Sequence, residues 1–279
     1  MSGLVMILML AAGGAAPLQA AGWIELAPGI DWRELTPTGT PAAGDAAIVA
    51  IRVDPAAWEL LLLYPDQHKD APARTARQWA DAHGLAIATN AGMFATDYRT
   101  HVGYMESRGH VVSQRFNSYQ SVAVFDPSRA GRVPPFRIVD LDVLGTTLES
   151  LRRDYSSILQ NLRLIKRPGI NKWNQQDRAW SEAALAEDAQ GRILFLFSRA
   201  VLAMSDFNRE ILSAGIGVVA AQHLEGGAES QLFVRLGDFV MELSGSYETP
   251  FGPGDDSPPA WPIPNVLGIR RRGAAAPGR

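Results

Sequence analysis

The residues best suited to chemistry lie in one short segment, from His223 to Ser230. It reads His-Leu-Glu-Gly-Gly-Ala-Glu-Ser and directly follows the apolar run 218–221. An apolar run of this length, bounded by glycines, predicts a buried strand. Two carboxylates, a hydroxyl and two adjacent glycines therefore emerge where a sheet can hold them rigidly and a loop can shape a pocket. The alternative interpretation is a polar turn after a core strand.

Two carboxylates and a histidine in this segment could transfer protons. Glu225 and Glu229 are four residues apart, and paired carboxylates are the usual means of cleaving a glycosidic bond. His223 lies two residues before Glu225, so a regular strand would place both side chains on one face. A structural histidine and a loop carboxylate that binds backbone amides are the alternatives.

Composition excludes several other classes of site. The chain has 279 residues, a net charge of −3 and a pI near 6.0, which argues against a nucleic-acid surface. It has no cysteine, so disulfides, thiolate chemistry and Cys-ligated zinc are excluded. The motifs of serine hydrolases, penicillin-binding enzymes and P-loop proteins are also absent.

The first residues resemble an export signal. The apolar run 4–16 is followed by small residues, as in the cleavage region of a signal peptide, although no Lys or Arg precedes it. The run is too short to span a bilayer, and no later segment is long enough, so no stable membrane span is expected. We expect residues 1–21 to be a signal peptide and the mature chain to be periplasmic or secreted.

Strands outnumber helices in the sequence pattern. We expect helices at 75–83, 146–159 and 205–212, and strands at 46–53, 58–64, 85–89, 120–125, 183–185, 192–197, 233–236, 239–243 and 265–269. Ser205 is the expected cap of the last helix. Many short strands without regular strand–helix alternation predict an α+β fold: a single domain with a mixed, largely antiparallel sheet packed by a few helices. This domain is expected to span 22–271, with a disordered tail at 272–279; the basic cluster 270–272 is interpreted as solvated.

Several separated segments, taken in order, resemble one family. Residues 86–94, Ala-Ile-Ala-Thr-Asn-Ala-Gly-Met-Phe, resemble its strand ending in Asn-Ala-Gly-Phe-Phe. Gln160-Asn161 resembles its Gln-containing strand, and Arg178 with 188–194 resembles its Arg-bearing strand and hairpin. The helix at 205–215 and Glu225-Gly226-Gly227 resemble its last helix and its Leu-Asp-Gly-Gly-Gly-Ser motif.

The family is the phosphodiester glycosidases related to the mannose 6-phosphate uncovering enzyme, an N-acetylglucosamine-1-phosphodiester α-N-acetylglucosaminidase. The resemblance covers roughly 46–269. This chain departs from the family pattern in three places: Glu225 replaces an Asp, Ala228-Glu229 interrupts the glycine run before Ser230, and the proline expected shortly after Gln160 is absent. The added methylene of Glu225 would move its carboxylate oxygens by about 1 Å, enough to affect the rate of a catalysed reaction.

The resemblance and the chemistry of the residues together suggest roles for particular side chains. Glu225 is the expected catalytic carboxylate and Arg178 the clamp for the phosphate, while His223 is expected as a proton-transfer partner because of its spacing from Glu225. The residues expected to contact substrate are Asn90, Gly92, Gly226, Gly227 and Ser230, together with Glu229, which stands where the family has glycine. The competing interpretations are an Asx turn at Asn90, an ion pair of Arg178 with Asp177 or Glu182, and a simple turn at the glycines.

The expected function is therefore that of an exported hydrolase. It would cleave a sugar-1-phosphate diester in cell-envelope or exopolysaccharide material, with the carbohydrate phosphodiester as its partner and no nucleic acid. The alternative is a non-catalytic polysaccharide-binding relative on the same scaffold, motivated by the altered Gly-Gly-Ala-Glu-Ser segment. No cofactor is certain; Asp255-Asp256 could bind a divalent cation or simply be solvated.

Overall fold

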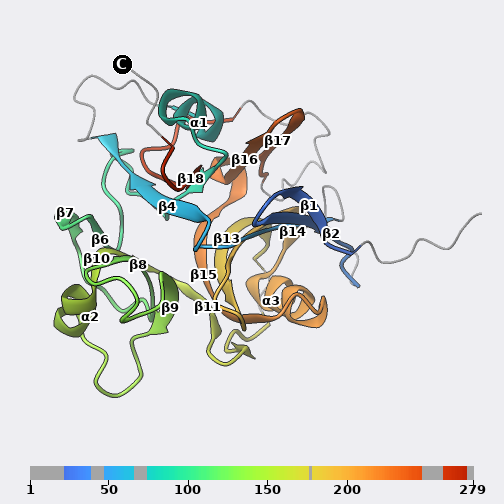
Figure 1. Ribbon diagram of the computed structural model, residues 1–279. Helices are drawn as coiled ribbons and strands as arrows, with labels where there is room; N and C mark the ends of the chain where they lie inside the picture. The colour runs from blue at the N-terminus through green and yellow to red at the C-terminus, as the bar shows by residue number, and fades with distance from the viewer. Residues whose placement is uncertain (1–21, 39–46, 66–73, 176–177, 247–259, 275–279) are drawn as a thin grey trace, which may run out of the picture.

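Three antiparallel sheets, each with one helix on its outer face, make up the computed structural model (Figure 1). The structure describes residues 22–38, 47–65, 74–175, 178–246 and 260–274. The expected signal peptide, Asp177 and Asp255-Asp256 lie outside these ranges. In the described residues no helix is long and apolar enough to cross a membrane.

The first sheet has eight strands and carries the segment of interest. Its spatial order is β1 (Ile24–Ala27), β2 (Ile30–Leu35), β3 (Ile48–Val53), β14 (Ile193–Leu202), β13 (Trp180–Asp188), β15 (Val218–Gly226), β11 (Arg163–Lys166) and β12 (Ile170–Asn171). The apolar run that precedes His223 therefore forms a strand, β15, as the sequence predicts. Strand β15 continues into a short 3-10 helix, η2 (Gly227–Glu229).

The other two sheets have five strands each. The second sheet has the order β7 (His110–Gln114), β6 (Tyr104–Ser107), β10 (Tyr155–Asn161), β8 (Ser121–Pro127) and β9 (Phe136–Asp140). The third has the order β17 (Phe239–Ser244), β16 (Gln231–Leu236), β5 (Ile87–Asn90), β18 (Val266–Arg271) and β4 (Trp58–Leu63). Every strand pair assigned within the described residues is antiparallel.

The α+β class is thus confirmed, but the expectation of one mixed sheet is wrong. The physical reason is the distribution of apolar side chains. One central core draws from all three sheets, with Phe195 on the first, Phe125 on the second and Leu267 on the third. Each sheet also buries its other face in a smaller cluster of its own, so three layers of strands can share one core.

Each of those smaller clusters lies beneath one helix. Helix α1 (Ala76–His83) covers the third sheet, α2 (Leu148–Asp154) the second and α3 (Met204–Ser213) the first. Figure 1 shows the three helices well apart on the outside of the molecule. Helix α1 matches its prediction, because Thr75 forms a capping box with Gln78 and Gly84 takes the left-handed conformation with φ of 62°.

Three sequence predictions need correction. Helix α2 stops at Asp154 instead of continuing to 159, because 155–161 form β10, which pairs with β8 and β6 in the middle of the second sheet. Helix α3 begins after Ala203 without a side-chain cap, so Ser205 is not its cap. The basic cluster is not a free tail: Arg270 and Arg271 end β18, Arg270 forms an ion pair with Glu59 at 3.0 Å, and the exposed Arg272 donates to the Pro55 carbonyl oxygen.

Candidate active site

The three sheets meet where β15 ends. In the first sheet, the His223 backbone N–H donates to the Leu162 carbonyl oxygen at 2.8 Å. The neighbouring Asn161, the last residue of β10, donates from Nδ2 to the Ala91 carbonyl oxygen at 2.9 Å. Asn90, at the end of β5, donates from Nδ2 to the Glu229 carbonyl oxygen at 3.0 Å. The segment from His223 to Glu229 is therefore bonded at one end to Leu162, which links β10 to β11, and at the other end to Asn90 of β5.

His223 forms a buried ion pair with a residue of the adjacent strand. Its Nδ1 lies 2.5 Å from Oε1 of Glu182 on β13, and each side chain is at most 3% exposed. The other carboxylate oxygen, Oε2, accepts from Nε1 of Trp180 at 3.0 Å. Burial lowers the pKa of His223, but the charge and hydrogen bond of Glu182 outweigh it, so the pKa is raised. The pair therefore favours imidazolium beside carboxylate.

Glu225 is the carboxylate with the altered acidity. Burial raises its pKa to about 7, against opposing effects of the His223 charge and the Gly226 backbone N–H, which donates to Oε1 at 3.1 Å. The nearby Glu229 and Glu182 carboxylates raise the pKa further. Near neutral pH this group can therefore exist in both protonation states, as a general acid or base requires.

The strand is irregular between His223 and Glu225. His223 pairs with Ala184 and Glu225 with Ala183, and the register shifts between those two pairs. The simple alternation assumed from the sequence, which put both side chains on one face, does not apply across this shift. The two groups nevertheless interact electrostatically, because the His223 charge lowers the pKa of Glu225.

The glycines and the serine shape the turn that follows. Trp180 lies against Gly226, where a Cβ atom would approach the indole ring to 2.5 Å. Gly227 takes a left-handed backbone with φ of 70°, and the buried hydroxyl of Ser230 donates to its carbonyl oxygen at 2.7 Å. These residues therefore fix the path of the chain past Glu225; their predicted contact with substrate stays a prediction.

Asn90 uses both ends of its amide to hold the same turn. Besides the bond to Glu229, its Oδ1 accepts from the Gln231 backbone N–H at 2.7 Å, and the side chain is buried. The structure thus brings Asn90 beside the backbone of Glu229. Substrate binding by Asn90 stays a prediction, and its observed contacts stabilise the site loop.

Gly92 lies in a tightly packed cluster one step further along the chain. A Cβ atom there would lie 2.3 Å from Asn161 Oδ1 and 2.5 Å from His101 Cε1. The space beside Gly92 is thus occupied by side chains of the protein itself, Asn161 and His101. Burial lowers the pKa of His101 to about 4, so this histidine is neutral.

Gln160 has a similar role in holding a loop. Its Oε1 accepts from the backbone N–H groups of Tyr104 and Asn117, and its Nε2 donates to the carbonyl oxygens of Asn117 and Tyr119. Gln160 therefore fixes the loop that contains Asn117.

No contact within the described residues places Arg178 beside Glu225 or Asn90. Arg178 lies two residues before β13 and its side chain is exposed. Of the two ion-pair partners considered from the sequence, Asp177 lies outside the described residues and Glu182 bonds instead to His223 and Trp180. Three hollows among the described residues are lined by other side chains, so a common cavity for Asn90, Arg178 and Glu225 stays a prediction.

Sequence reasoning missed Glu182 and Trp180 as members of the site. A signal for Glu182 was present, because it is a single carboxylate directly before the apolar run Ala183-Ala184-Leu185-Ala186 of β13, where only a paired charge is tolerated. No group of three His, Asp or Glu side chains that could hold a metal ion occurs in the part of the chain that the structure describes.

The arrangement joins a buried ion pair, a carboxylate of raised pKa and a glycine-rich turn at a strand end, and a carboxyl group with such a pKa can act as a general acid or base. The model of the phosphodiester glycosidase family matches residues 83–270. The chain belongs to that family. No curated protein matches the sequence at a significant level.

Solved structures share the fold. The catalytic domain of zebrafish N-acetylglucosamine-1-phosphodiester α-N-acetylglucosaminidase, auto-inhibited by its pro-peptide, is 14% identical with a TM-score of 0.60, covering 91% of this chain and 87% of that one. A hypothetical protein from Synechocystis is 17% identical with a TM-score of 0.63, over 92% of this chain and 64% of that one. A putative exported protein from Burkholderia pseudomallei K96243 is 10% identical with a TM-score of 0.51, over 82% and 75% of the two chains.

Proposed function

We propose that this protein is an exported hydrolase that cleaves a sugar-1-phosphate diester in cell-envelope or exopolysaccharide material. Family membership supports a glycosidase-type reaction. The observation that carries the proposal is the half-buried Glu225 carboxyl, whose pKa is raised to about 7 beside the Glu182–His223 ion pair. Export is supported by the signal-like sequence 1–21 and by the fold shared with a putative exported protein.

In the proposed reaction, water attacks the anomeric carbon of the sugar. The bond from that carbon to the phosphate oxygen breaks, and the electron pair leaves with the oxygen. Glu225, protonated, donates a proton to the leaving oxygen or, ionised, takes one from the attacking water. The products are the free sugar and a phosphate monoester.

The neighbouring residues have distinct proposed tasks. Glu182 and His223 form a buried pair without net charge, and their proposed task is to hold β15 and to set the acidity of Glu225 through the opposed charges of the pair. Arg178, exposed at the start of β13, would clamp the phosphate by two parallel hydrogen bonds, which a guanidinium provides and an ammonium does not. The backbone of Gly226 and Gly227 presents the turn along which the sugar would lie.

The test is a substrate whose two cleavage modes release different products. A p-nitrophenyl ester of a sugar 1-phosphate yields free sugar and p-nitrophenyl phosphate if the glycosidic bond breaks, but p-nitrophenol and sugar phosphate if the other phosphate ester bond breaks. We expect the first pair of products, and we expect both Glu225→Gln and Arg178→Ala to slow their release. Equal rates for these two variants and the unchanged protein would remove both residues from the mechanism, while saturable glycan binding without turnover would support the non-catalytic alternative.

A further inference from the structure

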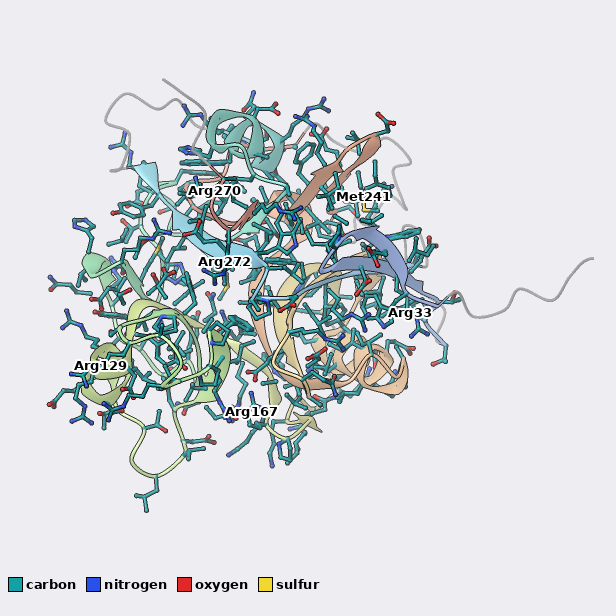
Figure 2. The ribbon with its side chains drawn as sticks, in the orientation of Figure 1. Arg33, Arg129, Arg167, Met241, Arg270 and Arg272 are labelled. Carbon is teal, nitrogen blue, oxygen red and sulfur yellow. The ribbon has the colours of Figure 1, made fainter. Side chains whose placement is uncertain are left out.

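A charged hollow lies on the second sheet, and Glu225 does not line it. It is lined by Arg129, Arg132, Val133, Arg153 and Asp154, has a volume of about 270 Å³, and is called the arginine hollow below. Figure 2 shows Arg129 beside α2, on the side of the molecule that the second sheet forms. No residue of the candidate active site contributes to its wall.

Backbone contacts fix the positions of the three arginines. The loop between β8 and β9 carries Arg129 and Arg132, and it is joined to α2 by a hydrogen bond from the Ser128 N–H to the Asp154 carbonyl oxygen at 2.8 Å. Gly131 turns the loop with φ of 74°, in the left-handed region that glycine adopts without strain. Val133 packs on the apolar cluster beneath α2.

The charges of this hollow are left uncompensated. No carboxylate of the described residues lies within ion-pair distance of Arg129, Arg132 or Arg153, whereas the adjacent Arg152 pairs with Glu106 at 3.0 Å. Arginine keeps its charge at any pH that a protein experiences. Three guanidinium groups and one carboxylate therefore leave the wall with a positive excess, which an anion would neutralise.

The chemistry of the wall narrows the class of ligand. Guanidinium groups bind phosphate oxygens in pairs, and the carboxylate of Asp154 can accept hydrogen bonds from hydroxyl groups. A volume of about 270 Å³ suits a small molecule rather than a bare ion. We propose that the arginine hollow binds a phosphorylated saccharide, with its phosphate on the arginines and its hydroxyl groups toward Asp154. This site is separate from the proposed hydrolytic site, and its occupancy does not depend on turnover.

The experiment is calorimetric titration of the full chain with α-D-glucose 1-phosphate, with inorganic phosphate and with glucose. The test variant carries Arg129→Gln, Arg132→Gln and Arg153→Gln. The matched control carries Arg77→Gln, Arg209→Gln and Arg235→Gln, three exposed arginines that are paired with carboxylates elsewhere, so both variants lose the same net charge. Arg153→Gln alone and Asp154→Asn complete the set.

We expect glucose 1-phosphate to bind more tightly than phosphate, and glucose not to bind measurably. The test variant should lose at least about tenfold in affinity and Arg153→Gln alone a smaller part, while the control stays within about twofold. Asp154→Asn should bring the two phosphate compounds to equal affinity. Equal losses in the test and control variants, or none in either, would overturn the site. Equal binding of phosphate and glucose 1-phosphate before any substitution would overturn the saccharide assignment.

Discussion

Two neighbouring regions use polar residues for opposite purposes. At the end of β15, Glu182, His223 and Glu225 are ionisable and close together, and the pKa values of His223 and Glu225 are raised. Beside them, Asn90 and Gln160 are neutral amides whose donors and acceptors are occupied by backbone groups. Glu225, Asn90 and Gln160 all lie in segments that resemble the family motifs, so motif membership alone does not separate the residues that could do chemistry from those that hold the fold.

The largest expected effect is on the catalytic rate, which we attribute to the charged residues at the end of β15. Glu225→Gln removes the titratable proton while keeping the shape of the side chain, so kcat should fall about 10²–10⁴-fold. The measurement is initial rate of sugar release from the sugar-1-phosphodiester. Glu242→Gln, an exposed carboxylate on β17, is the control and should retain full activity. A kcat unchanged in Glu225→Gln would show that the raised pKa has no catalytic use.

The next effect is on folding. Glu182→Gln leaves the buried His223 without its counter-ion, so the free energy of unfolding should fall by about 3–5 kcal/mol in urea denaturation. Combining it with His223→Gln should cost less than the sum of the single changes, because the uncompensated charge is then gone. The exposed pair of Arg235 and Asp81 provides the comparison, and Asp81→Asn should cost less than about 1 kcal/mol. Additive losses at Glu182 and His223 would contradict a coupled pair.

In the neutral region the expected losses come from packing. Gly92→Ala places a Cβ atom against Asn161 and His101 and should lower the free energy of unfolding by about 1–3 kcal/mol. Gly22→Ala, where nothing lies within 4 Å, should have little effect. Thermal unfolding followed by circular dichroism distinguishes the two variants, and equal melting temperatures would show that the cluster can relax.

A substitution at Asn90 tests whether this residue only holds the loop or also binds substrate. Asn90→Ala should cost about 1–3 kcal/mol of stability, because a buried carbonyl and a buried N–H lose their partner. If the amide only holds the loop, KM should change less than about threefold in protein that is folded. A large rise in KM at unchanged stability would instead make Asn90 a substrate ligand.

A further expected effect is the pH dependence of stability. The ordinary pKa of Glu225 is 4.5 and the folded value is about 7, so between these pH values the folded protein holds a proton that the unfolded chain has released. Stability therefore falls as the pH rises through this window, by about 3 kcal/mol from this group. His223, with its raised pKa, acts in the same direction. In Glu225→Gln the decline from pH 5 to pH 8 should be shallower; an unchanged slope would show that Glu225 is not protonated in the folded state.

The sequence predicts much of the local structure and little of its assembly. Strand β15 follows from an apolar run, and helix α1 from the helical spacing of its residues and the glycine at its end; these signals act within a few residues. Helix α2 was predicted too long, because residues 155–161 gain more from pairing with two strands than from helix propensity. The number of sheets depends on which strands pack their apolar faces against one another, and the pattern of a single sequence does not determine that packing.

The same limit applies to the site. The segment from His223 to Ser230 was identified because its residues are adjacent, whereas the partner of His223 is 41 positions away. Glu182 can be recognised as the partner of His223 only once the pairing of β13 with β15 is known. The role of Asn90 in holding the loop depends on a contact across 139 positions.

The meeting of three sheets at the end of β15 has a consequence for how the protein can fail. The segment that carries Glu225 is anchored by Leu162 between β10 and β11, by its pairing with β13, and by Asn90 of β5. Loosening any of these anchors is expected to release the segment. We therefore expect loss of activity on heating to coincide with global melting.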